Sequence, residues 1–283
     1  MSELIAYWKD EFVEVVLEKG NKGLAMFING GLQFTERDEY RYHQMLFLMP
    51  TLFFKNDIDV LVLGGGDGLG VRELLTQKHV KSIDLVDISP FIVNLAKYHP
   101  EMRRINRDSF WSDKLNVIIG DGYEYVHNTN KKYDLIIMDY PDPSIREDDP
   151  VNKLFTVDHF KGVKSVLKDN GIVSMQSTSV IISPNVFRLL ILRKREVYKN
   201  VIPLRINVNS YTDIGIIYAS DDEIEIVREI PPHAFFSKES IGSFMVFHRD
   251  ELPDIPDEVL KEKHISEVIA YDLYTRRKAQ GRI

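Results

Sequence analysis

Apolar runs of two kinds alternate along the middle of the chain. From residue 58 onward, continuous runs of strand length are separated by stretches in which apolar residues recur every three or four positions. The predicted strands are Ile58–Leu63, Ser82–Asp87, Leu115–Ile119, Tyr133–Asp139 and Gly171–Gln176. The predicted helices between them are Leu69–Gln77, Pro90–Tyr98 and Val157–Leu167. This alternation is typical of an α/β protein with a doubly wound, mostly parallel sheet.

The chain before this alternation has a different pattern. Two alternating runs, Phe12–Leu17 and Leu24–Ile28, flank the turn residues Gly20–Gly23 and predict a β-hairpin. Thr35 and Asp38 then resemble a capping box, which indicates the start of a helix.

The chain after residue 183 continues the α/β pattern and then loses it. A helix is predicted at Pro184–Tyr198, followed by strands at Val201–Val208 and Ile214–Ala219. From about residue 221 we expect a proline-punctuated tail of helices and loops. The chain is therefore divided into a short N-terminal β-hairpin region, residues 1–34, and a Rossmann-like domain, residues 35–283, that carries this tail.

Composition narrows the class of protein. The chain has 36 Lys and Arg against 43 Asp and Glu, a net charge of -7, and no cysteine. No basic block is longer than the three residues Arg193–Arg195, so we expect no nucleic-acid partner. Disulfides, thiolate metal sites and a cysteine nucleophile are excluded. Apolar runs fall short of the roughly 20 residues of a membrane helix, and the N-terminus lacks a signal-peptide pattern, so we expect a cytoplasmic protein without a membrane partner.

The turn after the strand at residue 58 is rich in glycine. The sequence LVLGGGDGLG, Leu61–Gly70, leads from a strand into a helix, and glycines let the backbone approach a ligand closely. The dinucleotide fingerprint G-x-G-x-x-G is not met, because apolar residues occupy its last position from either starting glycine. Gly64, Gly66 and Gly68 give G-x-G-x-G instead. That spacing suits nucleoside-type ligands without a pyrophosphate, of which S-adenosylmethionine is the commonest.

Acidic residues end the next predicted strands. Asp87 lies about 20 residues past the glycines, where a carboxylate can accept hydrogen bonds from ribose hydroxyls. Asp121 and Gly122 follow another strand, and Asp139 ends a third. Because open α/β sheets bind ligands at the carboxyl ends of their strands, these residues predict a site at that edge.

Asp67 lies inside the glycine cluster, where the amino-acid tail of S-adenosylmethionine is expected. A fixed negative charge there repels the carboxylate of the tail and attracts an ammonium. A decarboxylated tail therefore suits this position better, which favours aminopropyl transfer over methyl transfer.

Several longer motifs resemble the polyamine aminopropyltransferases, or spermidine synthases. The resemblance covers roughly residues 24–180 well and 200–220 moderately. The motifs are INGGLQFTERDEYRYHQM, VLVLGGGDGLGVREL, LVDIS, IIGDGYEYV, MDYPDP and LFTVDHFKGVKSVLKDNGIVSMQS. The resemblance implies a Rossmann-like methyltransferase sheet and transfer of the aminopropyl group of decarboxylated S-adenosylmethionine to a diamine or polyamine, with putrescine as the expected acceptor. The donor is a co-substrate, and neither a prosthetic group nor a metal ion is expected.

The resemblance also implies roles for individual residues. Those expected at the donor are Gln33, Gly64, Gly66, Asp67, Asp87, Asp121 and Gly122. Tyr42, His43 and Asp142 are expected where the aminopropyl group meets the acceptor amine, and Tyr211 at the far end of the acceptor. Asp139 matches the proton acceptor of the family, and Asp142 then neutralises or orients charge on the acceptor.

The sequence departs from the usual family pattern at three places. Tyr140 and Pro141 replace the small hydroxyl residues of D-S-S-D-P, which resembles a divergent D-x-P-D-P branch. Ser144–Arg146 replaces Gly-Pro-Ala. The segment 143–152, which contains an acidic run, is either a solvated loop or a lid over the site. The N-terminal region, which commonly supports dimer contacts, is short, so a homodimer stays an open alternative.

Two other functions remain as alternatives. One is an S-adenosylmethionine-dependent N-methyltransferase that acts on a polyamine, and the charge of Asp67 argues against it. The other is a non-catalytic polyamine- or nucleoside-binding relative, against which the combination of Gln33, Asp67, Asp139 and Asp142 argues.

Overall fold

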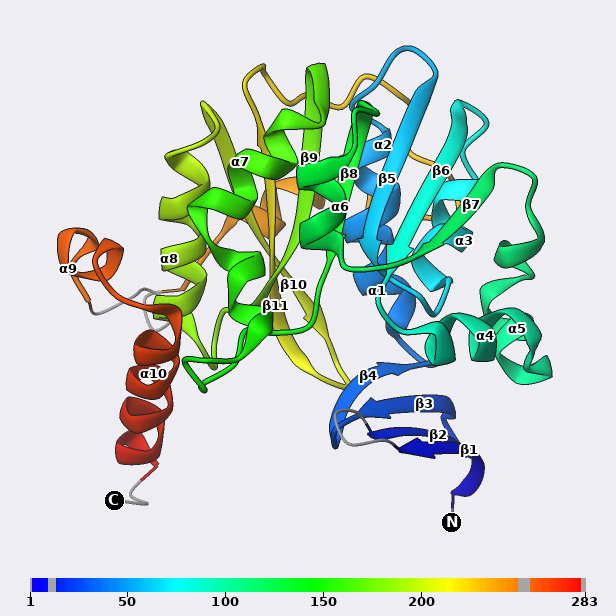
Figure 1. The fold of residues 1–283 in the computed structure, drawn as a ribbon, viewed down its shortest axis with the longest axis horizontal. Coiled ribbons are helices and arrows are strands. Elements are labelled where there is room, and N and C mark those ends of the chain that lie inside the picture. Colours follow the sequence, from blue (N-terminus) through cyan, green and yellow to red (C-terminus); the bar gives the residue numbers. More distant parts are fainter. Residues whose placement is uncertain (1, 10–13, 249–254, 281–283) are drawn as a thin grey trace.

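Two β-sheets form the framework of the protein. The structure is a computed structural model that describes residues 2–9, 14–248 and 255–280 (Figure 1). The larger sheet has the strand order β10-β11-β9-β8-β5-β6-β7. Its strands are β5 (Ile58–Gly64), β6 (Val80–Asp87), β7 (Leu115–Ile119), β8 (Tyr133–Asp139), β9 (Leu167–Ser179), β10 (Asn200–Val208) and β11 (Thr212–Ser220). β5 to β9 pair in parallel, and β11 runs antiparallel to both of its neighbours. The predicted α/β architecture is confirmed.

Helices cover both faces of this sheet (Figure 1). They include α3 (Leu69–Leu75), α4 (Pro90–Tyr98), α5 (Pro100–Asn106), α6 (Gly122–Asn128), α7 (Val157–Ser165) and α8 (Pro184–Arg195). In β5, Val60 and Val62 belong to one buried cluster, with residues of α3 and α4, while Leu61 and Leu63 belong to another, with residues of α6, α7 and α8. Burial on both faces explains why the strands read as continuous apolar runs.

The chain order reverses on either side of β5. β5 pairs with β8 on one side and with β6 on the other, and the Gly64 end of β5 lies opposite Asp139 of β8. This is the topological switch point, where ligands bind in open α/β sheets.

A second, antiparallel sheet lies below the first in Figure 1. Its strands, in order, are β1 (Glu3–Lys9), β2 (Glu14–Gly20), β3 (Gly23–Ile28) and β4 (Gly31–Thr35). The predicted hairpin is present as β2 and β3, although Phe12 and Val13 of its first predicted strand lie outside the described residues. β1 and β4 were not predicted. Trp8 stacks on Phe91 of α4, with 4.8 Å between ring centroids, and thereby attaches this sheet to the larger domain.

The helical segment after β4 begins differently from the prediction. It consists of α1 (Glu39–His43), the π-helical η1 (Gln44–Leu48) and α2 (Met49–Thr51). The predicted capping box is wrong, because Thr35 Oγ1 donates to the Asp38 carboxylate at 2.7 Å rather than to the helix backbone. Asp38 also accepts a hydrogen bond from the Ser210 amide at 2.8 Å. Asp38 therefore connects the start of α1 to the turn between β10 and β11.

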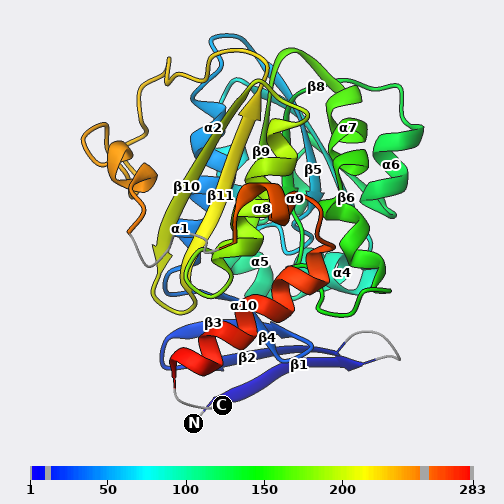
Figure 2. The ribbon, with the colours of Figure 1, turned by 90° about the vertical axis from the view of Figure 1, so that its left-hand side faces the viewer.

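The remaining elements are short helices and the C-terminal tail. They are η2 (Ser109–Trp111), η3 (Pro150–Phe155), η4 (Ile241–Met245), α9 (Asp257–Lys261) and α10 (Ile265–Ala279). α10 lies beside α8 (Figure 2), where Asp272 accepts a hydrogen bond from Asn185 Nδ2 at 2.6 Å. Among the described helices, none combines the length and apolar character needed to span a membrane.

Candidate functional site

The glycine turn lies against the carboxyl end of β8. Gly64 has φ +86°, and a Cβ there would collide with the backbone carbonyl of Asp139. A Cβ on Gly66 would lie 2.5 Å from a carboxylate oxygen of Asp87. Both positions therefore require glycine, for conformation at Gly64 and for close approach at Gly66.

Asp87 is held beside this turn at the end of β6. Its carboxylate accepts hydrogen bonds from the Gly66 amide at 2.9 Å and the Ser89 amide at 2.8 Å. Burial, together with the nearby Asp67 carboxylate, raises its pKa. The side chains of Ile88 and Ile119 next to it are 72% and 49% exposed. The sequence analysis did not single out these two exposed apolar residues, of which Ile88 follows Asp87 in the chain and Ile119 pairs with Asp87 on the neighbouring strand.

Asp121 begins α6, one strand further along the sheet. One carboxylate oxygen accepts from the Tyr123 amide at 2.8 Å, and the other forms an ion pair with Lys153 Nζ at 2.7 Å. Burial opposes ionisation, but these two contacts outweigh it and lower the pKa of Asp121. Gly122 follows directly, so the predicted donor residues Asp87, Asp121 and Gly122 lie at the carboxyl ends of adjacent strands.

Asp139 is the last residue of β8 and faces the helix α1. The Tyr42 hydroxyl donates a hydrogen bond to its carboxylate. Burial and the Asp67 and Asp87 carboxylates raise the pKa of Asp139 to about 6, although the nearby His43 acts in the opposite direction. The structure therefore combines the predicted Tyr42, His43, Asp67 and Asp139 in one electrostatic cluster, and Asp139 is suited to exchange a proton near neutral pH.

His43 belongs to a buried ionic network. Its Nδ1 lies 2.7 Å from a Glu39 carboxylate oxygen, and Arg72 of α3 donates to both oxygens of the same carboxylate, at 2.9 and 3.0 Å. Burial lowers the pKa of His43, but the Glu39 carboxylate outweighs it and raises the pKa. Glu39 and Arg72 thus fix His43 and lock α1 against α3.

One residue that the sequence analysis missed lies beside the predicted Asp142. Gln176 of β9 donates through Nε2 to Asp142 at 2.8 Å. Gln176 Oε1 and the Tyr211 hydroxyl are buried without a hydrogen-bond partner among the described residues. The charges of Asp67 and Asp139 contribute to the raised pKa of Tyr211, which places the predicted Tyr211 near the carboxylates. Gln176 lies within a strand, where a single polar residue gives no signal in the sequence.

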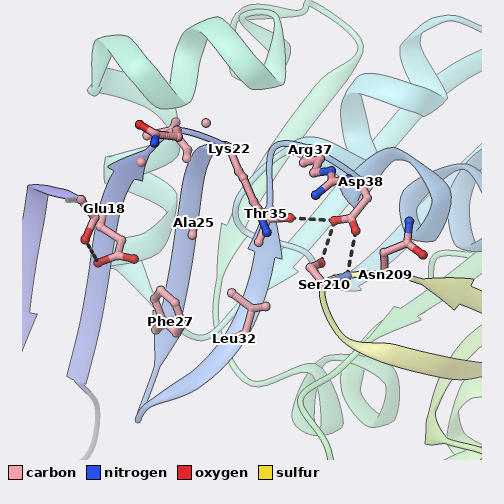
Figure 3. Close-up of a pocket in the computed structure, with 15 residues that line it drawn as sticks. Glu18, Lys22, Ala25, Phe27, Leu32, Thr35, Arg37, Asp38, Asn209 and Ser210 are labelled. Atoms are coloured by element: carbon pink, nitrogen blue, oxygen red, sulfur yellow. Dashed lines mark hydrogen bonds between the residues drawn. The ribbon is translucent and has the colours of Figure 1, made fainter.

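Gln33 is exposed on β4, and its Nε2 donates to the Gly31 carbonyl at 3.1 Å. The structure shows it bonded within its own turn, so its predicted role at the donor stays a prediction. A hollow of about 590 Å³ lies near it, between the N-terminal sheet and the β10–β11 turn, lined by residues such as Phe27, Leu32 and Asp38 (Figure 3). None of the predicted site residues lines this hollow. The predicted site residues lie apart from this hollow, at the carboxyl edge of the large sheet.

The loop after Asp142 is ordered by internal hydrogen bonds. Asn152 accepts from the Ser144 amide at 2.9 Å and donates to the Arg146 carbonyl at 2.8 Å, and Arg146 pairs with Asp149 at 2.8 Å. Its role as a lid stays a prediction. Within residues 2–9, 14–248 and 255–280, no group of three or more His, Asp or Glu side chains is arranged to hold a metal ion.

Comparisons with known proteins agree with this geometry. Residues 39–229 match the family model described as the spermine/spermidine synthase domain. A polyamine aminopropyltransferase of Sulfolobus acidocaldarius is 36% identical over 215 residues, which are 75% of this chain and 70% of that protein. One of Leptospira interrogans is 29% identical over 271 residues, 95% of this chain but 54% of that protein. The chain thus spans about half the length of some of its relatives.

Solved structures share the fold. Spermidine synthase from Thermotoga maritima superposes with a TM-score of 0.71 at 22% identity, covering 96% of this chain and 88% of that one. A spermidine synthase in complex with the transition state analogue AdoDATO superposes with a TM-score of 0.72, with the same identity and coverage.

Proposed function

Because the chain belongs to the spermine/spermidine synthase family, we propose that it transfers the aminopropyl group of decarboxylated S-adenosylmethionine to a diamine or polyamine nitrogen. The proposed acceptor is putrescine, which gives spermidine and 5'-methylthioadenosine. The family resemblance found in the motifs is confirmed by the family model, and the D-x-P-D-P branch stays a prediction.

The carboxylate cluster at the switch point is the observation that carries this proposal. Asp67, Asp87, Asp139 and Asp142 form no ion pair with Lys or Arg among the described residues, while the nearby Glu39 and Asp121 are each paired with a cation. Burial raises the pKa of all four unpaired carboxylates. Carboxylates without a Lys or Arg partner favour the binding of positively charged substrates. The sulfonium donor with its ammonium tail and the diamine are both positively charged.

Asp67 supports the choice of donor. Its carboxylate accepts from the Leu69 amide at 2.9 Å, which holds it at the start of α3. A carboxylate on the donor tail would face this charge, whereas the ammonium of a decarboxylated tail is attracted by it. We therefore favour aminopropyl transfer over the alternative of a polyamine N-methyltransferase.

The reaction needs a base rather than an acid. The amine nitrogen forms a bond to the aminopropyl carbon while the bond from that carbon to sulfur breaks, and the sulfonium leaves as a neutral thioether. A free primary amine has a pKa of about 10.4 and is protonated at neutral pH, so its proton must be removed. Asp139 takes this proton, Tyr42 orients the Asp139 carboxylate, and Asp142 with Gln176 holds the acceptor. Tyr211 offers its unpartnered hydroxyl at the same end.

The donor residues follow from the same proposal. Gly64 and Gly66 let the backbone approach the nucleoside, Asp87 accepts from the ribose, and Asp121 with Gly122 faces the base. Gln33 remains a proposed contact of the aminopropyl tail. A cytoplasmic location and a homodimer remain proposals that rest on the sequence alone.

The test is the mass of the product. The protein is incubated with either decarboxylated or ordinary S-adenosylmethionine and with putrescine, cadaverine, agmatine, spermidine or 1,3-diaminopropane. We expect an amine that has gained an aminopropyl group, with release of 5'-methylthioadenosine, only from the decarboxylated donor. A methylated amine would support the N-methyltransferase instead, and binding without turnover of either donor would support the non-catalytic alternative.

A further inference from the structure

Tyr140 is the residue that replaces a small hydroxyl in the family pattern, and its side chain lies under the Asp121–Gly122 turn. It follows Asp139 in the chain but is buried with the residues of α6, α7 and α8. A Cβ built on Gly122 would lie 3.2 Å from the Tyr140 hydroxyl. The tip of the tyrosine therefore supports the backbone of the turn at the point where the proposed donor base binds.

His159 of α7 fixes the position of this tyrosine. Its Nε2 lies 3.0 Å from the Tyr140 hydroxyl, and its side chain is fully buried. The other ring nitrogen, Nδ1, is buried without a hydrogen-bond partner among the described residues, so the contact with Tyr140 is the hydrogen bond that orients the ring. Burial and the nearby Lys194 lower the pKa of His159 to about 3, so the ring is neutral at physiological pH.

The same histidine also reaches the other side of the turn. It stacks on Tyr123, the residue after Gly122, with 5.3 Å between ring centroids and 19° between ring planes. Lys153 lies 4.7 Å from the centroid of Tyr123 and pairs with Asp121 at 2.7 Å. Contacts therefore connect Tyr140 to His159, His159 to Tyr123, Tyr123 to Lys153, and Lys153 back to Asp121 of the turn.

We propose that Tyr140 and His159 are positioning residues. They fix the position of the Asp121–Gly122 backbone and thereby determine the affinity for the nucleoside part of the donor. The inference rests on the proposed function, which assigns this turn to the donor base. A hydrophobic side chain of similar size would pack in the core equally well. It would lack the hydroxyl that contacts His159 and lies next to Gly122. The pair thus offers a physical reason for the large residue at position 140.

The experiment compares substitutions at both members of the pair. Tyr140→Ser restores the small hydroxyl of the family pattern and removes the support, so we expect the KM for decarboxylated S-adenosylmethionine to rise about tenfold. Tyr140→Phe removes only the hydrogen bond, for which about a threefold rise is expected. His159→Leu also removes the stacking on Tyr123 and is expected to raise the KM at least as much. His159→Gln loses the stacking too but keeps an N–H near the position of Nε2, so its KM is expected to lie closer to the wild-type value than that of His159→Leu.

Three further readouts separate positioning from general damage. We expect no change in the KM for the amine or in kcat. We also expect no change in the pH midpoint of the rate, which reports on Asp139. Tyr198→Phe is the matched control, because the Tyr198 hydroxyl is also buried beside α7 and donates to the Phe160 carbonyl at 3.3 Å. This control should leave the KM for the donor unchanged.

Titration with 5'-methylthioadenosine measures the same affinity without turnover. We expect Kd to rise in parallel with the KM for the donor in Tyr140→Phe and His159→Leu, which keeps the test available if Tyr140→Ser does not fold. Wild-type affinity in both of these variants would overturn the inference, as would equal changes in Tyr198→Phe. If the wild-type protein binds the nucleoside but forms no aminopropylated amine, the proposed reaction fails while the positioning role is still tested.

Discussion

At the scale of single residues, the environment of Asp139 decides what its carboxylate can do. The sequence places an aspartate at the end of a buried strand, but only the fold brings Asp67, Asp87 and Tyr42 to it. Together with burial, the two neighbouring carboxylates raise the pKa of Asp139 to about 6. A carboxylate tuned in this way is ionised at neutral pH and still basic enough to accept a proton from an amine.

The rate is therefore expected to depend on pH through this group. Asp139 must be ionised to accept a proton, so kcat/KM should fall about tenfold per pH unit below about pH 6. A pH profile of kcat/KM, measured with both substrates below saturation, checks this expectation, because it reports on the free enzyme. A kcat/KM that stays constant down to pH 5 would show that Asp139 does not titrate in the free enzyme.

The same shift has a consequence for stability. The pKa of Asp139 is raised from 3.8 to about 6, so the stability that this group contributes is present below pH 3.8 and is lost as pH rises through about 6. Asp139→Asn should therefore stabilise the protein at pH 7.5, by on the order of 2 kcal/mol. Urea unfolding measures the change, with the exposed Asp113→Asn as control. A destabilised Asp139→Asn variant would contradict the assigned shift.

Lys194 is a buried cation without a carboxylate partner among the described residues. Its Nζ donates to the sulfur of Met138 at 3.4 Å and lies 3.9 Å from the ring centroid of Phe160. Burial lowers its pKa from 10.5 to about 7, so folding favours the neutral amine, and this group lowers stability most at and below pH 7.

Lys194→Met should raise the free energy of unfolding at pH 7 by on the order of 2 kcal/mol. The gain should shrink as pH rises toward 10.5, where the lysine is neutral in the unfolded chain as well. Urea unfolding at several pH values tests both statements, with the exposed Lys161→Met as the matched control. A gain that is independent of pH would indicate better packing rather than removal of a charge.

At the scale of elements, the ionic network of Glu39, His43 and Arg72 connects two helices that carry site residues. α1 bears Tyr42 and His43, and α3 follows the glycine turn. Because all three side chains are buried, removing one partner leaves a charge without compensation in the core.

Arg72→Met should therefore cost about 3–5 kcal/mol of stability, whereas Arg103→Met, which breaks an exposed pair with Asp108, should cost less than about 1 kcal/mol. The double variant Arg72→Met with Glu39→Gln should cost less than the sum of the single changes, because the Glu39 carboxylate is then not left without Arg72. Part of the cost remains, because the buried Glu73, which pairs with Arg72 at 2.8 Å, still loses its partner. Urea unfolding of the four variants tests this. Equal costs for Arg72→Met and Arg103→Met would rule out a structural role for the network.

The elements differ in how well the sequence predicts them. The strands Leu115–Ile119 and Tyr133–Asp139 were predicted with the observed bounds. β8 is central and largely buried, which gives it the apolar run Leu135–Met138, whereas β7 is a partly exposed edge strand that was found from the short apolar run Val117–Ile119. β1 and β4 were missed: β1 contains the apolar run Leu4–Trp8, which was not assigned to a strand, and β4 is only five residues long and has no such run. The capping box failed because Asp38 has partners in the β10–β11 turn, and a contact across about 170 residues is not visible in a local pattern.

The same limit applies to the site. Gly64, Asp87 and Asp139 could be placed together from their positions at strand ends alone. Gln176 and the pairing of Tyr140 with His159 could not, because they depend on which side chains point toward each other after the sheet is assembled. Family resemblance supplied roles for Gln33 and Tyr211, and the structure supports a place near the carboxylates for Tyr211.

At the scale of the whole molecule, the candidate site is built from elements far apart in the sequence. The proposed donor residues come from β5, β6 and α6, and the proposed acceptor residues come from α1, β9 and the β10–β11 turn.

The most direct test of the proposed chemistry is a single-turnover measurement of 5'-methylthioadenosine release from decarboxylated S-adenosylmethionine with putrescine, compared between the wild-type protein, Asp139→Asn and the control Asp113→Asn. We predict that Asp139→Asn slows release at least about a hundredfold while the Kd for the donor changes less than about threefold, and that Asp113→Asn behaves as wild type. Release from Asp139→Asn at the wild-type rate would contradict the role of Asp139 as the proton acceptor.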